Sequence, residues 1–258
     1  MTPQVLRKII FQDISCVIIV SIANRFAMAL RWPKPMHPPR LKPYRYLPIC
    51  ECGEPLIPIP ADRLCLIDPH PYARLGAPYA AHSPFSLRYS VVQKLLQAQD
   101  YLQQLHPGWR LQIRDAYRPN AVQAFMVRHT YQALAATQPE ADPATLLAQV
   151  YQIWAVPSDD PATPPPHSTG AAVDVTLLDA GGQPVDMGAP LDEVSPRSWP
   201  DYYPPESPYG RHRRLLHEVM RQAGFVRHPQ EWWHFSWGDQ LWAWVTGAPA
   251  ALYGRVEE

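Results

Sequence analysis

Segment 171–178 constrains the fold of this chain most, because its side chains alternate strictly in polarity. Apolar residues recur at every second position: Ala171, Val173, Val175 and Leu177. The residues between them are small or polar: Ala172, Asp174 and Thr176. Alternate residues of a β-strand point to opposite faces of its sheet. The pattern therefore predicts a strand with one face on a hydrophobic core and with Asp174, between two small neighbours, on the other.

Periodic patterns elsewhere predict further helices and strands. Apolar residues at helical spacing predict helices over about 84–105, 120–136 and 211–223. Another helix is expected to begin at Asp142-Pro143, an N-cap residue followed by proline at the first helical position. Alternating residues predict strands over 109–115 and 231–237. Because these elements follow no regular βαβ order, the sequence predicts an α+β fold.

The size and charge of the chain limit its organisation and its partners. The chain has 258 residues, 47% of them hydrophobic, which is enough for one core and a small appendage. We expect a single domain over 41–258, preceded by an extension over 1–40. The formal net charge is zero and only 18% of residues are charged, so no nucleic-acid or membrane-surface partner is predicted. The charge of a substrate stays open.

The N-terminal extension resembles a weak secretory signal. Basic residues precede a short apolar run over 14–23, and the small-residue sequence Ala27-Met28-Ala29 follows it. Asp13 and Arg25 interrupt the pattern, and translation from Met28 or Met36 is an alternative. The run is far shorter than the roughly 20 residues that a membrane span requires. The compartment therefore stays open, with the cytoplasm slightly favoured over export.

The four cysteines form no familiar metal-binding pattern. They are Cys16, Cys50, Cys52 and Cys65. Cys50 and Cys52 could supply half of a metal site, but no second pair of cysteines or histidines follows at a suitable spacing. We expect free thiols or a single disulfide.

His167 and Asp174 are candidate metal ligands. The turn His-Ser-Thr-Gly170 could fold the imidazole of His167 back over the strand toward Asp174. A catalytic zinc takes three protein ligands and one open position, and the segment Glu231-Trp-Trp-His234 offers the third. Glu231 could then take a proton from the attacking water. This geometry requires that the segment bends near Trp232, or that Glu231 lies in the turn before the strand.

Each of these residues also has an ordinary structural explanation. A single histidine more often makes a hydrogen bond than binds a metal, and the chain contains ten. Asp174 could cap a loop. In Arg114-Asp115-Ala-Tyr-Arg118, an arginine could donate to a developing oxyanion or form a salt bridge with Asp115. From these residues alone, a zinc hydrolase is one hypothesis among several.

Three segments together resemble the zinc D-alanyl-D-alanine dipeptidases, the branch of peptidase family M15 known from vancomycin resistance. They are Asp115-Ala-Tyr-Arg-Pro119, His167-Ser-Thr-Gly-Ala-Ala-Val-Asp174-Val-Thr-Leu177 and Glu231-Trp-Trp-His-Phe235. The resemblance spans roughly 64–237 and does not include the first 60 residues. It implies the hedgehog-like peptidase fold of that family, a mixed and mainly antiparallel sheet packed with helices, with a zinc site on the sheet.

The resemblance also implies a role for each candidate residue. One zinc ion would be held by His167, Asp174 and His234. Glu231 would be the general base, Arg118 would stabilise the tetrahedral intermediate, and Asp192 would hold the free amino group of the substrate. The implied reaction is hydrolysis of D-alanyl-D-alanine or a similar D-amino-acid dipeptide in cell-wall metabolism.

The resemblance leaves alternatives open. The wider family has a serine two residues before the first histidine, where this chain has Pro165, so the contact of that hydroxyl is missing. A D,D-carboxypeptidase or endopeptidase acting on peptidoglycan stem peptides is one alternative, and a non-catalytic zinc-binding domain is another. Glu231 argues against the latter, because a structural zinc needs no base. The oligomeric state and the choice among divalent metals stay open.

Overall fold

The computed structural model describes residues 42–79 and 82–256. The predicted extension over 1–40, with its signal-like run and Cys16, lies outside the described residues, so its assignment and the domain boundary at 41 stay predictions. Within the described ranges, Cys50, Cys52 and Cys65 are free thiols, one of the two expected outcomes. None of the helices described there combines the length and apolar character needed to cross a bilayer.

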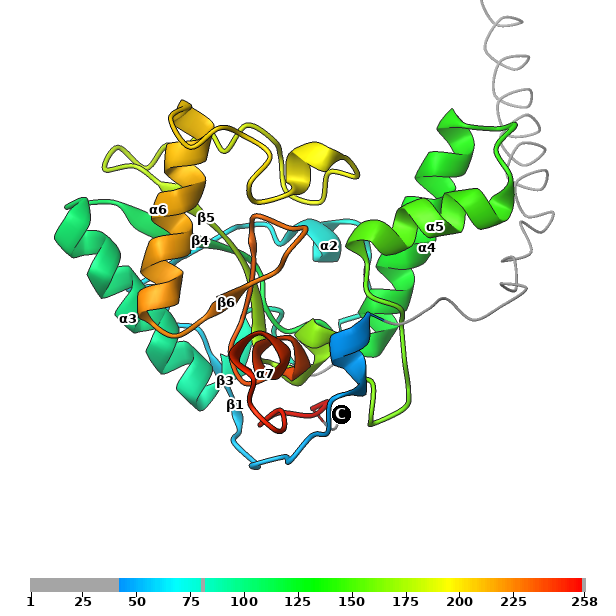
Figure 1. Cartoon of the computed structure of the whole chain (residues 1–258), viewed down its shortest axis with the longest axis horizontal. Helices are drawn as coiled ribbons and strands as arrows, with labels where there is room; N and C mark the ends of the chain where they lie inside the picture. The colour runs from blue at the N-terminus through cyan, green and yellow to red at the C-terminus, as the bar shows by residue number, and fades with distance from the viewer. Residues whose placement is uncertain (1–41, 80–81, 257–258) are drawn as a thin grey trace, which may run out of the picture. The chain divides into compact units, whose positions relative to one another are not determined.

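A sheet of five strands runs through the centre of the described residues, in the order β2-β4-β5-β7-β6 (Figure 1). The strands are β2 (Cys65–Leu66), β4 (Arg110–Asp115), β5 (Ala172–Leu178), β6 (Val226–Arg227) and β7 (His234–Ser236). β2 pairs parallel with β4, and the other neighbours pair antiparallel. The prediction of a mixed, mainly antiparallel sheet is therefore confirmed. A separate antiparallel pair joins β1 (Leu56–Pro58) to β3 (Ser86–Arg88).

Two helices cover the apolar face of the sheet. They are α3 (Tyr89–Leu105) and α6 (Pro208–Gln222). Leu95 of α3 and Leu216 of α6 belong to the same buried core as Ile113 of β4 and Val175 of β5. The alternation seen in segment 171–178 is thus satisfied, because its odd-numbered side chains point into this core.

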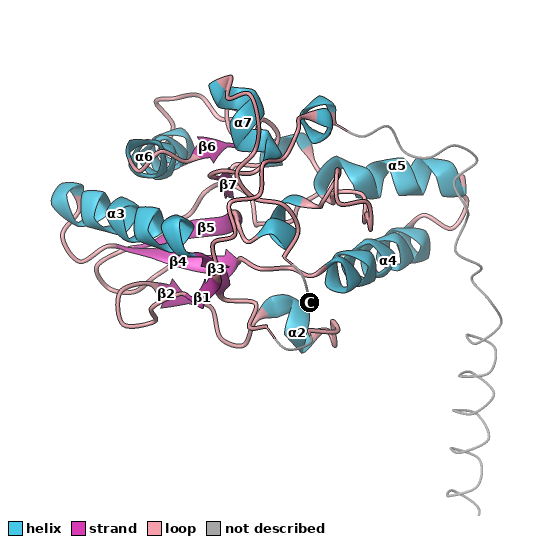
Figure 2. Cartoon of the chain, turned by 90° about the horizontal axis from the view of Figure 1, so that it is seen from below, coloured by secondary structure: helices cyan, strands magenta, loops and turns pink. Residues whose placement is uncertain are grey.

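A second helical pair lies apart from the first (Figure 2). It consists of α4 (Asn120–Thr137) and α5 (Pro143–Ile153), which share their own buried cluster with Tyr72 and Trp154. α5 begins as predicted, since the carboxylate of Asp142 accepts hydrogen bonds from the backbone N–H groups of residues 144 and 145. The remaining elements are short: α2 (Pro71–Arg74), α7 (Gln240–Thr246), η1 (Pro43–Tyr46), η2 (Pro166–Thr169) and η3 (Pro196–Ser198).

Three predicted boundaries were wrong. The helix expected from residue 84 begins at Tyr89, because residues 86–88 pair with β1 as a strand instead. The helix expected from 211 begins at Pro208, where Ser207 supplies an N-cap. The last strand is shorter than 231–237 and begins only at His234, which leaves Glu231 in the turn before it.

The register between the central strands places three polar residues in one row across the sheet. Asp115 of β4 lies opposite Asp174 of β5, and Asp174 lies opposite His234 of β7. A register shift between Ile113 and Asp115 leaves Arg114 unpaired. Such a bulge reverses the faces of the residues that follow it. Without the bulge, regular pairing would put Arg114 beside Asp174, so the irregularity turns Asp115 toward the polar face.

The core beneath this row can be tested on α3. Leu95 is fully buried, whereas Leu105 of the same helix is 57% exposed. We expect Leu95→Ala to lower the free energy of unfolding by about 2–5 kcal/mol, because it leaves a cavity in the core. Leu105→Ala should change it by less than about 0.5 kcal/mol. Denaturant unfolding monitored by circular dichroism measures both, and equal effects would contradict this description of the core.

Candidate metal centre and active site

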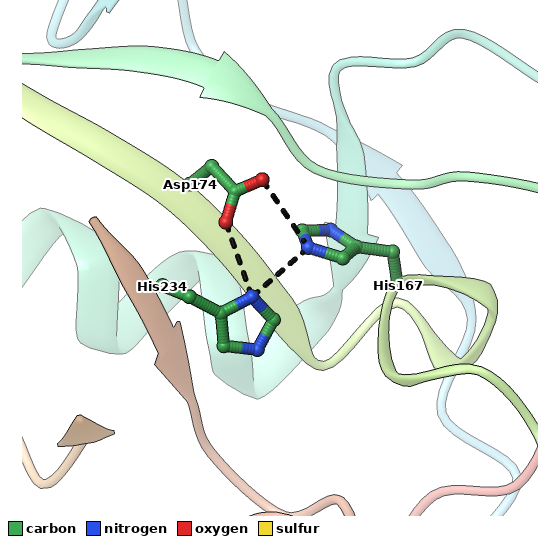
Figure 3. Close-up of side chains that lie close together, drawn as sticks. All are labelled: His167, Asp174 and His234. Atoms are coloured by element: carbon green, nitrogen blue, oxygen red, sulfur yellow. Dashed lines mark hydrogen bonds and ion pairs between the residues drawn. The ribbon is translucent and has the colours of Figure 1, made fainter. Parts of the chain in front are cut away.

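The three predicted metal ligands come together on the polar face of the sheet (Figure 3). Asp174 comes from the middle of β5 and His234 from the first position of β7. His167 comes from η2, which ends at Gly170 with a left-handed φ of 68°. A side chain at Gly170 would collide with Leu56, so glycine allows the turn that folds His167 over the strand.

The distances between the ligand atoms match those around a tetrahedral zinc ion. Nε2 of His167 lies 3.1 Å from Nδ1 of His234 and 3.4 Å from Oδ2 of Asp174. Nδ1 of His234 lies 3.1 Å from Oδ1 of Asp174. Tetrahedral bonds of about 2.05 Å to zinc place two ligand atoms roughly 3.3 Å apart. The residues present therefore fit a zinc ion.

Supporting hydrogen bonds orient both imidazoles. Nδ1 of His167 donates to the carbonyl oxygen of Ala116 at 2.8 Å, which leaves Nε2 free to face the centre. The hydroxyl of Ser236 donates to Asp239, so its oxygen accepts from Nε2 of His234 at 3.3 Å and leaves Nδ1 facing the centre. Assigned in this way, the two rings direct their lone pairs at each other. Such an arrangement requires a positive charge between them.

The pKa values in this cluster show the same preference for positive charge. Burial alone would raise the pKa of Asp174. The charges and hydrogen bonds of His167 and His234 lower this pKa by more than burial raises it, so the carboxylate is ionised. Burial alone would lower the pKa of His234, but the hydrogen bond and charge of Asp174 raise it overall. The ligand atoms thus favour a proton or a metal cation among them.

Glu231 lies beside the metal centre without belonging to it. Its Oε2 is 3.8 Å from Nδ1 of His234, and its side chain is buried in the turn that precedes β7. This position decides between the two geometries left open by the sequence, since Glu231 lies before the strand. Burial raises the pKa of Glu231, which Lys42 partly offsets. A raised pKa suits a carboxylate that must take up a proton and later release it.

Arg118 lies between Asp174 of the metal centre and Asp115 of the neighbouring strand. Its Nη2 lies 2.8 Å from Asp115 and 3.4 Å from Asp174, and its Nη1 donates to Gln123. Its guanidinium lies over the rings of Tyr72 and Trp154. The salt bridge foreseen for Asp115 thus exists with Arg118. Arg118, not Arg114, lines the pocket that contains the metal centre.

Asp192 lines the same pocket from the loop after β5. It holds a left-handed φ of 62°, unusual for a residue other than glycine, and its Oδ2 accepts a hydrogen bond of 2.9 Å from the hydroxyl of Tyr72. Burial raises the pKa of Asp192 to about 6, and the charge of Asp174 adds to the effect. A residue other than glycine in this sparsely populated backbone region is typical of functional sites.

Several residues of this site were not predicted from the sequence. Tyr72 donates to Asp192, and Nε2 of His70 donates to Asp115 at 3.0 Å. Lys42 and His228 lie beside Glu231. Tyr72, His70 and Lys42 belong to segments far from the three motifs, and no local pattern marks them. His228 alone carried a signal, because it stands three residues before Glu231 in the same turn.

Comparison with known proteins agrees with this geometry. The model of the peptidase family M15, described as D-ala-D-ala dipeptidase, matches residues 66–248. The chain belongs to this family. A D-alanyl-D-alanine dipeptidase of Synechocystis sp. is 50% identical to this member over 242 residues, which cover 84% of this chain and 98% of the relative. A D-alanyl-D-alanine dipeptidase of Escherichia coli is 37% identical over 130 residues, 50% of this chain and 55% of that one.

Solved structures related to this M15 peptidase are more distant in sequence. A mutant of the vancomycin resistance D,D-pentapeptidase VanY, in complex with Zn(II), is 15% identical with a TM-score of 0.44 and covers 79% of this chain and 95% of that one. VanYB in complex with D-alanine-D-alanine is 17% identical with a TM-score of 0.42, over 66% of this chain and 86% of that one.

Zinc binding tests the metal centre directly. We expect the purified protein to bind one zinc ion, and Asp174→Asn to weaken binding by more than the roughly 10- to 100-fold that loss of a supporting residue costs. The exposed Asp100→Asn is the matched control and should bind zinc normally. Competition with a chromophoric chelator gives both affinities. Unchanged affinity in Asp174→Asn would place the metal elsewhere.

Proposed function

We propose that this chain is a zinc-dependent dipeptidase that hydrolyses D-alanyl-D-alanine or a similar D-amino-acid dipeptide in cell-wall metabolism. One observation carries the proposal: a base candidate, Glu231, and a second carboxylic acid, Asp192, share one pocket with the three metal ligands. The names of the relatives from Synechocystis and Escherichia coli support this substrate.

The metal ligands and the base divide the chemistry between them. His167, Asp174 and His234 would hold the zinc ion. When bound, zinc supplies Lewis-acid chemistry, which polarises a carbonyl group and lowers the pKa of water. Glu231 takes a proton from the attacking water and delivers it to the nitrogen of the leaving amino acid. Its raised pKa makes the carboxylate a stronger base toward the water, and the proton that it gains is the one that the leaving nitrogen receives.

Arg118 supplies a fixed positive charge next to the scissile carbonyl. Asp115, Gln123 and the two aromatic rings hold its guanidinium in one orientation before any substrate binds. A donor fixed in this way stabilises the oxyanion of the tetrahedral intermediate without reorganisation. Loss of one such donor typically slows a reaction by about 10²- to 10³-fold.

Asp192 favours substrates with a free amino group. Its half-buried carboxylate can pair with the ammonium group of a dipeptide, and this pairing would offset the cost of keeping the carboxylate ionised. A longer peptide would present a neutral amide there instead, which leaves the carboxylate unpaired. The pocket therefore favours a dipeptide over the stem peptides taken by a D,D-carboxypeptidase or endopeptidase.

The catalytic role of Glu231 is tested by D-alanine release from D-alanyl-D-alanine, detected with ninhydrin. We expect zinc-loaded wild-type enzyme to release D-alanine and Glu231→Ala to lose about 10²- to 10⁴-fold in rate while its zinc content stays unchanged. Glu218→Ala, which removes an exposed carboxylate from α6, is the matched control. Equal rates for wild type and Glu231→Ala would remove Glu231 from the mechanism. Failure of the wild type to release D-alanine would refute the dipeptidase.

The role of Asp192 is tested with a substrate that lacks the ammonium group. We expect Asp192→Asn to lower kcat/KM for D-alanyl-D-alanine by roughly 10- to 100-fold, the usual effect of losing a charged hydrogen bond. Activity on N-acetyl-D-alanyl-D-alanine should change much less. Asparagine also accepts left-handed backbone, so the loop is preserved. The control is Asp186→Asn in the same loop. If both substrates lose activity equally, Asp192 does not recognise the amino group.

A further inference from the structure

The pocket holds a partner for one end of a dipeptide, and the other end needs a partner of opposite charge. A dipeptide is a zwitterion, with an ammonium group before the scissile bond and a carboxylate after it. Asp192 suits the ammonium group. Among the described residues that line the pocket, Lys42 and Arg118 are the lysine and arginine side chains. One of these two is therefore the candidate partner for the carboxylate.

Arg118 is already committed to other groups. Its guanidinium bonds to Asp115, Gln123 and Asp174, and it also contacts the rings of Tyr72 and Trp154. Lys42 has more hydrogen-bond donors free to bind a ligand. Its Nζ lies 2.9 Å from Nε2 of His228 and 3.9 Å from Oε1 of Glu231, and its side chain keeps 30% of its surface exposed. An ammonium group has three donors, so the contact with His228 leaves two for a ligand.

A series of contacts separates Lys42 from Asp192 within the pocket, and metal ligands lie within that series. Starting from Asp192, successive contacts lead through Tyr72, Arg118, Asp174, His234 and Glu231 to Lys42. The metal ligands Asp174 and His234 lie in the middle of this series. An anion at one end and a cation at the other match the charges of a dipeptide whose peptide bond lies over the metal.

The backbone around Lys42 is held firmly. The residue immediately precedes η1, in which Tyr44 is buried and Arg45 donates to the carbonyl oxygen of Val156. Gln240 of α7 donates to the carbonyl oxygens of Arg45 and Leu47. Burial also lowers the pKa of Lys42, partly offset by Glu231, so a carboxylate ligand would stabilise its charged form. The cation is therefore presented to the pocket from a fixed position.

We propose that Lys42 binds the carboxylate of the dipeptide and so restricts the enzyme to substrates that end one residue after the scissile bond. This inference rests on the proposed dipeptidase activity. It assigns a specificity residue to a segment upstream of residues 66–248, the part that matches the family model. Together, Lys42 and Asp192 would bind the two charged ends of the substrate and so select for the length of a dipeptide.

The test compares D-alanyl-D-alanine with D-alanyl-D-alaninamide, in which the carboxylate is replaced by a neutral amide. We expect the zinc-loaded wild type to prefer the acid. Lys42→Met should raise KM for the acid by roughly 10- to 100-fold and change KM for the amide far less. Lys42→Arg should keep the preference. Lys94→Met, which removes a lysine of α3 that contacts Trp237, is the matched control and should match the wild type.

Two results would overturn the role of Lys42. If Lys42→Met impairs both substrates equally, the lysine acts through Glu231 instead of through the substrate. If the wild type has the same KM for the acid and the amide, no residue of the pocket recognises the carboxylate.

A binding measurement separates this inference from the proposed function. Calorimetry would compare the acid and the amide on Glu231→Gln, with and without Lys42→Met. A preference for the acid that disappears with Lys42→Met supports the inference even if the wild type cleaves neither compound, in which case only the dipeptidase is refuted. Equal affinities for acid and amide in Glu231→Gln would overturn the inference itself.

Discussion

The site depends on one buried interaction, the bridge that Arg118 makes between Asp115 and Asp174. These aspartates lie directly opposite each other on β4 and β5, and both are almost fully buried. Two like charges in that position destabilise a sheet. The guanidinium between them offsets this repulsion and is itself held in place by both carboxylates. The strand register, the proposed metal ligand Asp174 and the proposed oxyanion donor Arg118 therefore depend on one another.

The surroundings of the carboxylates separate their roles. Asp174 faces two imidazoles and stays ionised, which a metal ligand requires. Glu231 is also buried but has more distant charged partners, and its pKa is raised. Two carboxylates with pKa values shifted in opposite directions indicate different tasks, here ligand and base. Neither residue type nor spacing fixes this division, because it follows from what surrounds each carboxylate in the folded chain.

The residues of the three motifs were predictable from the sequence, including His167 and Glu231 on irregular backbone, but the residues that distant segments bring to the site were not. The alternation in segment 171–178 correctly placed Asp174 opposite the core, because one face of that strand is covered by α3 and α6. Simple alternation in 109–115 misplaces Asp115, since the bulge at Arg114 exchanges the two faces. The family resemblance supplied the role of Asp192. No local pattern indicated Tyr72 or Lys42, which reach the pocket through tertiary contacts alone.

The left-handed backbone of Asp192 limits how this pocket can change during evolution. At a φ of 62°, asparagine, aspartate and glycine are the residues that fit with least strain. Glutamate, which carries the same charge, would meet a conformational cost and would also extend further into the pocket. Single substitutions that preserve the loop can therefore remove the charge but not relocate or reverse it cheaply. A descendant that accepts blocked or longer peptides would most easily arise through asparagine or glycine at this position, with the rest of the pocket unchanged.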